Sequence, residues 1–197
     1  MSDYLGNYCF LSTIDEFLSL DLKEWISAMR ENYFCVTPYE LTAAQETAWK
    51  DSFHVLQRTF TRAVKENRDY GKLHILFEYV LPDFDHPYGC RPDVLIVMKD
   101  RIAVLEFKSR AIDDENYIYV TKQAKKYKKR LEYNHAASGE SKVRVAAVMT
   151  SMKDTLEKRE RIYCVSPDKL YDILPSLLSL HPEPVEDIYE WTDSAYY

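Results

Sequence analysis

Within residues 89–110, GCRPDVLIVMKDRIAVLEFKSR, two acidic residues and one lysine stand on two segments that are otherwise apolar. Asp93 stands before the run VLIVM, and Glu106 and Lys108 close the run that begins at Ile102. Charged side chains are rarely left at the buried end of a strand unless they are paired or bind a ligand. These three residues are therefore the first candidates for chemistry in the chain.

The spacing of the three residues predicts that a hairpin brings them together. We expect strands over 92–98 and 102–108, so that Asp93 meets the far end of the second strand. Because side chains alternate along a strand, Glu106 and Lys108 point to one face. The simpler interpretation is a surface hairpin whose charges only end its strands. Three charged residues together, each beside apolar neighbours, favour a site.

The side-chain types at this site suit metal-assisted phosphate chemistry. Two converging carboxylates, Asp93 and Glu106, suit a hard divalent cation such as Mg²⁺. A bound Mg²⁺ acts as a Lewis acid and activates water. A neighbouring lysine such as Lys108 can orient or deprotonate that water, or stabilise negative charge on a phosphate.

A basic segment follows the candidate site in a chain whose formal net charge is −6. Clustered bases neutralise phosphates, so this segment favours DNA binding, with a solvated helix face as the alternative. Arg91, just before Pro92, extends the basic patch. The bases of the segment are Lys122, Lys125, Lys126, Lys128, Lys129 and Arg130.

Hydrophobic periodicity predicts a mixed α/β order around these residues. We expect one or two helices within 13–32, and a helix over 43–67 that begins at a capping box, Thr42 to Gln45. The segment 83–91 reads as a loop. Strands are expected over 73–80, 92–98, 102–108, 143–150 and 162–165, and further helices over 113–135 and from 166 onward.

Length and composition place the chain among ordinary globular proteins. Its 197 residues are 46% hydrophobic and 29% charged, enough for one domain with a small helical appendage. The four glycines form no GxxxxGK[ST] or GxGxxG phosphate loop. The amino terminus lacks the pattern of a signal peptide, and no apolar run is long enough to span a membrane, so a cytoplasmic protein without membrane partners is expected.

The four cysteines are scattered and form no CxxC pair, so we interpret them as reduced and structural. A zinc or iron–sulfur site stays open if the fold gathers them. They are Cys9, Cys35, Cys90 and Cys164.

Pro92-Asp93 followed by Glu106-Phe107-Lys108 resembles the PD-(D/E)xK nuclease superfamily in motif, spacing and element order, over roughly 43–165. Gln123 and Tyr127, at i and i+4 of one helix, resemble the Q-x-x-x-Y element of its RecB-like members. The resemblance implies a restriction-endonuclease-like core of helix, three-strand meander, helix and strand, with an N-terminal helical extension.

The same resemblance implies a Mg²⁺-dependent deoxyribonuclease, in which Mn²⁺ can substitute. Asp93, Glu106 and the carbonyl of Phe107 would hold the metal, and Lys108 would orient the attacking water. Gln123 and Tyr127 would help hold DNA, with Lys122, Lys125, Lys126 and Arg91 nearby. The family adds one more acid, for which Glu78 is the first candidate and Glu46 the alternative. Only Cys164 follows the Gln/Tyr helix, so the iron–sulfur cluster of some relatives is not expected.

More narrowly, FEYVLP, RPDVL and VLEFK look like the N-terminal nuclease-like domain of bacterial proteins that continue into a superfamily 1 helicase or ATPase. Such proteins are frequently associated with antiviral defence against phage, and the resemblance to them implies a helicase or ATPase as a partner. The expected organisation is an N-terminal helical extension over 1–40, a nuclease-like domain over 41–180 and an acidic, aromatic tail over 181–197. That tail either packs back onto the domain or leads into a missing domain.

Two other functions stay open on the sequence. The first is a catalytically weak nuclease-fold module that docks DNA or a partner protein. The second is an assembly subunit or homo-oligomer, because sixteen tyrosines and three tryptophans would suit an interface.

Overall fold

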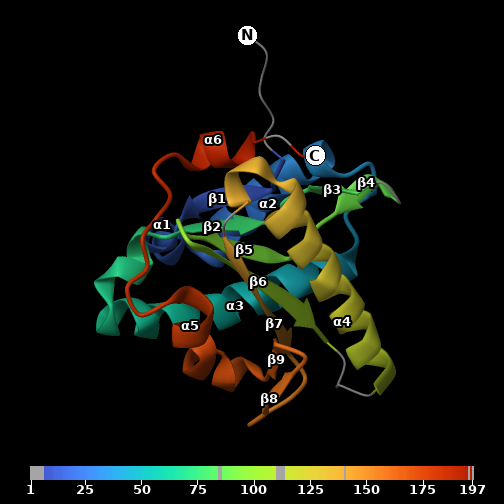
Figure 1. Ribbon diagram of the computed structural model, residues 1–197. Helices are drawn as coiled ribbons and strands as arrows, with labels where there is room; N and C mark the ends of the chain where they lie inside the picture. Colours follow the sequence, from blue (N-terminus) through green and yellow to red (C-terminus); the bar gives the residue numbers. More distant parts are fainter. Residues whose placement is uncertain (1–6, 84–85, 110–113, 140, 195, 197) are drawn as a thin grey trace.

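The computed structural model describes residues 7–83, 86–109, 114–139, 141–194 and 196; at 83, 86–88 and 114–116 it describes the backbone alone. The protein is a mixed α/β structure in which helices cover both faces of a seven-stranded sheet, with a two-stranded hairpin beside it (Figure 1). The strands are β1 (Phe10–Thr13), β2 (His74–Phe77), β3 (Leu81–Asp83), β4 (His86–Cys90), β5 (Val94–Val97), β6 (Arg101–Lys108), β7 (Lys142–Met149), β8 (Leu156–Arg159) and β9 (Ile162–Val165). The α-helices are α1 (Ile14–Ser19), α2 (Leu22–Val36), α3 (Ala43–Glu66), α4 (Asp114–Lys129), α5 (Leu170–Leu178) and α6 (Ile188–Thr192).

The sheet has the strand order β1-β2-β5-β6-β7-β9-β8. Its strand pairing changes from antiparallel to parallel at β6. Strands β2, β5 and β6 form an antiparallel meander, in which Val94 pairs with Leu105. Strand β7 then runs parallel to β6, and β9 runs parallel to β7. A parallel pair needs a crossover, and α4 is the crossover from β6 to β7. The first turns of α4 therefore follow the end of β6 that carries Lys108.

The two faces of the sheet carry different helices (Figure 1). Helices α1, α2, α3 and α5 share one hydrophobic core with one face. Helices α4 and α6 pack on the opposite face, over a second cluster that includes Val104 and Tyr127. Alternation along β6 sends Leu105 into the first core and Val104 into the second. Glu106 and Lys108 therefore share a face, as predicted, and this is the face that α4 covers.

Helix α3 forms where the sequence predicted a helix, and its N-terminus is capped by Thr42. The Thr42 side chain accepts a hydrogen bond of 3.1 Å from the backbone N–H of Gln45. The other half of the predicted capping box does not form, because the Gln45 side chain donates to Glu78 instead. The apolar stripe of α3 is buried, with Trp49, Phe53, Leu56, Phe60 and Val64 in its core.

Other predicted elements are also confirmed, although two strands of the seven-stranded sheet were missed. Helices α1 and α2 lie in the predicted N-terminal helical region, and the helix expected over 113–135 is α4 followed by a short π-helix, η2 (Arg130–Asn134). The missed strands are β1, which pairs with β2 at the sheet edge, and β8, which pairs with β9. The N-terminal segment is therefore more than a helical extension.

The segment 83–91, predicted to be a loop, contributes to the β3–β4 hairpin. Its proline and glycine are typical of loops, which is why the strand was missed. Gly89 has φ +70°, and a Cβ there would lie 2.5 Å from the carbonyl oxygen of Leu81. The hairpin therefore needs glycine at this position for both conformation and space.

The described part of the tail packs onto the α4 face of the sheet. Ile188 and Trp191 of α6 are buried in the second cluster. The Tyr79 hydroxyl donates a hydrogen bond of 3.0 Å to the Thr192 carbonyl, and the Tyr196 hydroxyl donates one of 3.3 Å to Tyr79. Among the described helices, none has the length and apolarity that crossing a membrane requires.

Candidate functional site

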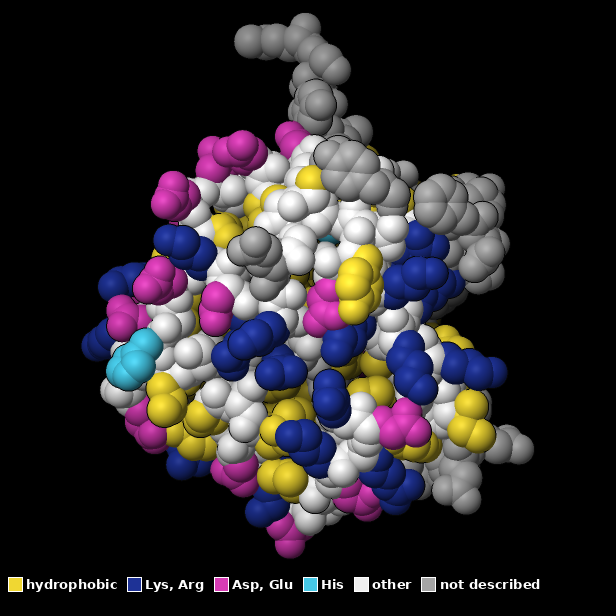
Figure 2. Space-filling model, in the orientation of Figure 1, with side chains coloured by type: hydrophobic (Ala, Val, Ile, Leu, Met, Phe, Trp, Pro, Cys, Tyr) yellow, Lys and Arg dark blue, Asp and Glu magenta, His cyan; other side chains and the backbone are white. Residues whose placement is uncertain are grey.

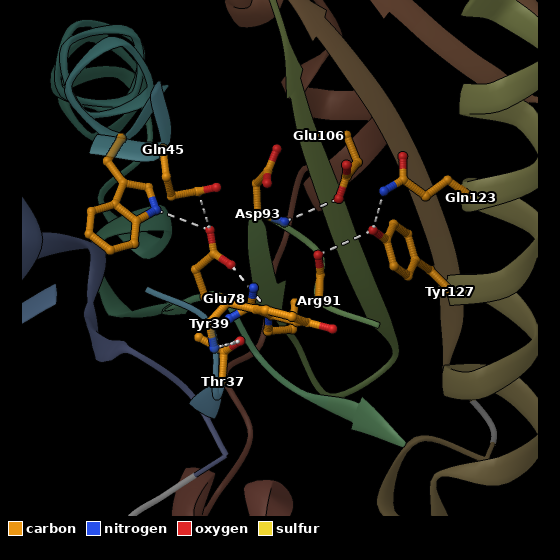
Figure 3. A network of polar contacts seen from close by, with 10 residues as sticks. Thr37, Tyr39, Gln45, Glu78, Arg91, Asp93, Glu106, Gln123 and Tyr127 are labelled. Atoms are coloured by element: carbon orange, nitrogen blue, oxygen red, sulfur yellow. Dashed lines mark hydrogen bonds and ion pairs between the residues drawn. The ribbon is translucent and has the colours of Figure 1, made fainter. Parts of the chain in front are cut away.

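Asp93, Glu106 and Lys108 meet where β5 begins and β6 ends. Figure 3 shows Asp93 and Glu106 at this place. The Asp93 backbone N–H donates a hydrogen bond of 3.1 Å to Glu106 Oε1, and the Phe107 N–H donates one of 2.6 Å to Asp93 Oδ2. The Lys108 ammonium lies 2.8 Å from Glu106 Oε2. The structure thus confirms the predicted juxtaposition of the three charged residues.

The carbonyl of Phe107 also faces this site. Thr150 donates its backbone N–H to the Lys108 carbonyl, so the polar backbone groups of Lys108 face β7. The N–H of Phe107 points the other way, to Asp93. The N–H and C=O of one residue in an extended strand point to the same side. The Phe107 carbonyl therefore points past the end of β5, toward the carboxylates.

The carboxylates of the site lie close together and are poorly solvated. Burial, then the neighbouring charges of Glu106 and Glu78, raise the pKa of Asp93 well above its ordinary value. Burial alone would lower the pKa of Lys108, but the charges of Glu106 and Asp93 outweigh it and raise that pKa. Lys108 is therefore a firmly protonated cation that offsets part of the negative charge.

Glu78 lies directly after β2 and its side chain is almost fully buried, with 4% of the residue exposed. Its φ of +52° is uncommon for a non-glycine residue and turns the side chain away from strand alternation. Oε1 accepts hydrogen bonds of 3.0 Å each from Gln45 and Trp49, and Oε2 lies 3.7 Å from the Arg91 guanidinium. Burial raises the pKa of Glu78, although the Arg91 charge opposes this.

Glu46, the other candidate for the additional acid, lies elsewhere. Its carboxylate pairs with Arg30 of α2 at 2.5 Å and with Lys50 of α3 at 2.8 Å. The structure therefore brings Glu78, and not Glu46, to the site. No local sequence pattern indicates that Gln45 and Trp49 hold Glu78, since these residues lie 33 and 29 positions away from it in the chain.

A pocket of about 490 Å³ opens beside these residues. It lies between the α3 side, which supplies Gln45, and the inner face of α4, which supplies five residues at helical spacing. The residues that line it are Gln45, Glu78, Gly89, Cys90, Arg91, Asp93, Tyr119, Lys122, Gln123, Lys126 and Tyr127. Glu106 lies behind this surface, since only 2% of the residue is exposed.

Gln123 and Tyr127 tie α4 to the segment that precedes Asp93 (Figure 3). The Gln123 amide donates a hydrogen bond of 2.8 Å to the Tyr127 hydroxyl, which donates one of 3.2 Å to the Arg91 carbonyl. Burial, then the charges of Glu106 and Asp93, raise the pKa of Tyr127 well above its ordinary value. The tyrosine therefore stays a neutral donor at the pocket wall.

The basic residues of α4 divide into two groups. Lys122 and Lys126 line the pocket, whereas the Lys125 ammonium lies 3.1 Å from Glu160 in the β8–β9 connection. The structure thus does not bring Lys125 to the site with the other predicted DNA-binding residues. In Figure 2, Lys and Arg side chains spread over the middle and right of the face in view, and acidic side chains gather at its upper left, over α6.

No three His, Cys, Asp or Glu side chains among the described residues gather as a metal-binding cluster. The four cysteines, all within the described residues, form no disulfide, and they lie apart in the sequence. The donors at the site are two carboxylates, Asp93 and Glu106, and the Phe107 carbonyl. Such a set fits Mg²⁺, which is commonly held by one or two carboxylates and keeps several waters.

Comparison with known proteins adds no relative to this description. No protein-family model matches the chain, and no curated protein is significantly similar to it.

Proposed function

We propose that this protein is a divalent-metal-dependent nuclease that hydrolyses DNA phosphodiester bonds, with a restriction-endonuclease-like core of the PD-(D/E)xK type. One observation carries the proposal: Asp93, Glu106 and Lys108 converge at one end of the β5–β6 hairpin, beside a pocket walled by lysines. Crowded buried carboxylates destabilise a fold unless a ligand uses them. Perturbed carboxyl groups in a pocket therefore support a catalytic role.

Asp93 and Glu106, with the Phe107 carbonyl, would hold the metal. When bound, Mg²⁺ or Mn²⁺ supplies a Lewis acid and a more acidic water. The raised pKa of Asp93 supports this assignment, because a cation beside the carboxylates would offset their mutual repulsion. The Asp93 N–H and the Phe107 N–H hold the two carboxylates in place before a ligand arrives.

Lys108 would act as a cation and not as a base, because its pKa is raised. Hydrolysis adds one water across a P–O bond: the water oxygen bonds to phosphorus, and the leaving oxygen takes up a proton. Glu106 orients the Lys108 ammonium, which donates hydrogen bonds to the attacking water and to phosphate oxygens as these gain negative charge.

The pocket walls would position the DNA strand. Lys122 and Lys126 supply positive charge along one wall. Among the described residues that line the pocket, two buried polar atoms have no hydrogen-bond partner, Arg91 Nη1 and the Gln123 side-chain oxygen. Buried polar atoms without partners are costly, so both are suited to a bound strand. Lys125, which pairs with Glu160, is left out of this proposal.

Glu78 would assist from the edge of the pocket. Its contacts with Gln45, Trp49 and Arg91 fix its orientation, so it would hold Arg91 toward the strand and add negative charge near the metal. The helicase or ATPase partner, the role in antiviral defence and a homo-oligomeric state stay predictions from the sequence.

A cleavage assay tests the proposed function. Supercoiled plasmid, end-labelled linear duplex and single-stranded DNA would be incubated with the protein and Mg²⁺, Mn²⁺ or EDTA, beside Lys108→Ala. We expect metal-dependent cleavage that EDTA abolishes and that Lys108→Ala lowers by at least about 100-fold. The proposal fails if the folded variant cleaves as well as the parent, or if the parent cleaves none of these substrates with either metal.

A further inference from the structure

Tyr119 is a large aromatic side chain that lines the pocket and is exposed to solvent. It is 60% exposed, so its ring contributes little to the core of the protein. Several other large hydrophobic side chains are similarly exposed in the described part of the chain, but among them Tyr119 alone lines the pocket beside Asp93. They are Phe34, Tyr39, Ile118, Tyr133, Leu156, Leu180 and Tyr189.

The ring of Tyr119 lies among cations of the candidate site. The Lys108 ammonium is 5.7 Å from the ring centroid, within the range of a cation–π contact. Lys122, one helical turn further along α4, lines the same pocket and is exposed. The surface beside the carboxylates thus offers a flat aromatic face together with positive charge. A ligand that matches both is a nucleotide, with its phosphate at the cations and its base against the ring.

We propose that Tyr119 stacks on the base next to the scissile phosphate, so that the site takes unpaired nucleic acid strands in preference to duplex. This inference rests on the proposed function. A base within a duplex has its faces covered by its neighbours, and only an unpaired or extruded base offers a free face to a protein ring. The residue would therefore determine substrate class as well as affinity.

The test compares Tyr119→Ala with Tyr119→Phe, which keeps the ring, and with Tyr133→Ala as the matched control. Tyr133 follows α4, is 76% exposed and does not line the pocket. Cleavage rates would be measured on one sequence as a single strand and as a duplex. We expect the parent to favour the single strand, and Tyr119→Ala to lower kcat/KM on that strand about tenfold. Tyr119→Phe and Tyr133→Ala should stay within about twofold of the parent, as stacking needs only the ring of Tyr119.

A binding measurement separates this inference from the proposed function. In the Asp93→Asn background, a single strand carrying the fluorescent base 2-aminopurine would be titrated, and stacking would quench the probe. Stacking is supported if Asp93→Asn/Tyr119→Ala loses the quenching that Asp93→Asn/Tyr133→Ala keeps. This result would stand even if the parent cleaves no DNA, and in that case only the nuclease proposal would fail. Equal quenching with and without Tyr119, no quenching at all, or equal cleavage of single strand and duplex by the parent would overturn the inference.

Discussion

Two groups of buried titratable side chains lie on the α4 face of the sheet, and they differ in what surrounds them. Asp93, Glu106 and Lys108 lie beside a pocket of about 490 Å³, where Lys108 pairs with Glu106, and burial and nearby acidic groups raise the pKa of Asp93. His135 is 1% exposed and is enclosed by rings, with centroid distances of 4.4 Å to Trp191 and 4.8 Å to Tyr196. The first group is open and charged, and the second is closed and neutral.

The difference shows how burial alone fails to identify a site. Burial lowers the pKa of His135 to about 4, so this histidine is neutral at pH 7 and packs as an aromatic ring. Nδ1 of His135 is hydrogen-bonded to the hydroxyl of Ser138. The carboxylates instead keep unfavourable charges together next to a space that a ligand can enter. We infer that the packed rings around His135 add to the stability of the fold and that the crowded carboxylates of Asp93 and Glu106 reduce it.

The largest expected effect on stability is at Trp191, which holds the aromatic group together. Trp191→Ala should lower the free energy of unfolding by about 3 kcal/mol or more, because the buried indole leaves a cavity against Tyr79 and His135. Urea denaturation measures the change. Tyr189→Ala, in the same helix but 66% exposed, is the control and should change the stability little. Equal losses in both variants would show that α6 adds no specific packing.

The next effect is on activity and lies in the other group. Asp93→Asn should lower cleavage roughly 100-fold or more, since the amide cannot replace a carboxylate as a metal ligand. The amide oxygen can still accept the Phe107 N–H, so the fold should persist. Single-turnover cleavage measures the loss. Wild-type rates in a folded Asp93→Asn variant would remove Asp93 from the mechanism.

His135 should make the protein more stable as the pH rises, whereas Asp93 should make it less stable. The pKa of His135 is about 4 in the folded state and near the ordinary value of 6.5 in the unfolded state. Its contribution is therefore full above pH 6.5 and is lost as the pH falls toward 4, a loss of about 3 kcal/mol. His135→Gln should lack this slope between pH 6.5 and 5, as measured by urea denaturation at each pH. Tyr79, with its pKa raised to about 12, does not titrate in that window.

The smallest effect is a gain in stability from removing the charge of Asp93. The pKa of Asp93 is raised in the folded state, so its ionisation destabilises the fold as the pH rises above the unfolded value. Asp93→Asn should therefore be more stable than the parent by ~1 kcal/mol at pH 7, and the difference should vanish near pH 4. Thermal unfolding without metal measures it. A variant less stable than the parent at pH 7 would contradict the inferred strain.

The sequence predicted the centre of the site because short-range geometry determines it. Strand alternation and a short turn fix how Asp93 meets Glu106 and Lys108, and helical spacing places Gln123 beside Tyr127. The helix predicted at 43–67 and the strands at 92–98 and 102–108 follow from the same periodicities.

The surroundings of the site depended on contacts that no local pattern reports. Glu78 was predicted within a strand over 73–80, but β2 ends at Phe77, and a left-handed turn aims Glu78 at Gln45 and Trp49. The rotation of α4, which brings Lys122 and Lys126 to the pocket and leaves Lys125 with Glu160, is set by how the helix packs on the sheet.

The central claim is that Asp93, Glu106 and Lys108 form a metal site and that the cluster around His135 does not. The most direct test is the melting temperature of the parent and of Asp93→Asn, with Mg²⁺ or Mn²⁺ and with EDTA. A ligand that binds only the folded state stabilises it by about 2.7 kcal/mol at 100 times its Kd. We predict that either metal raises the melting temperature of the parent and leaves that of Asp93→Asn unchanged. No shift in the parent, or the same shift in both proteins, would contradict the claim.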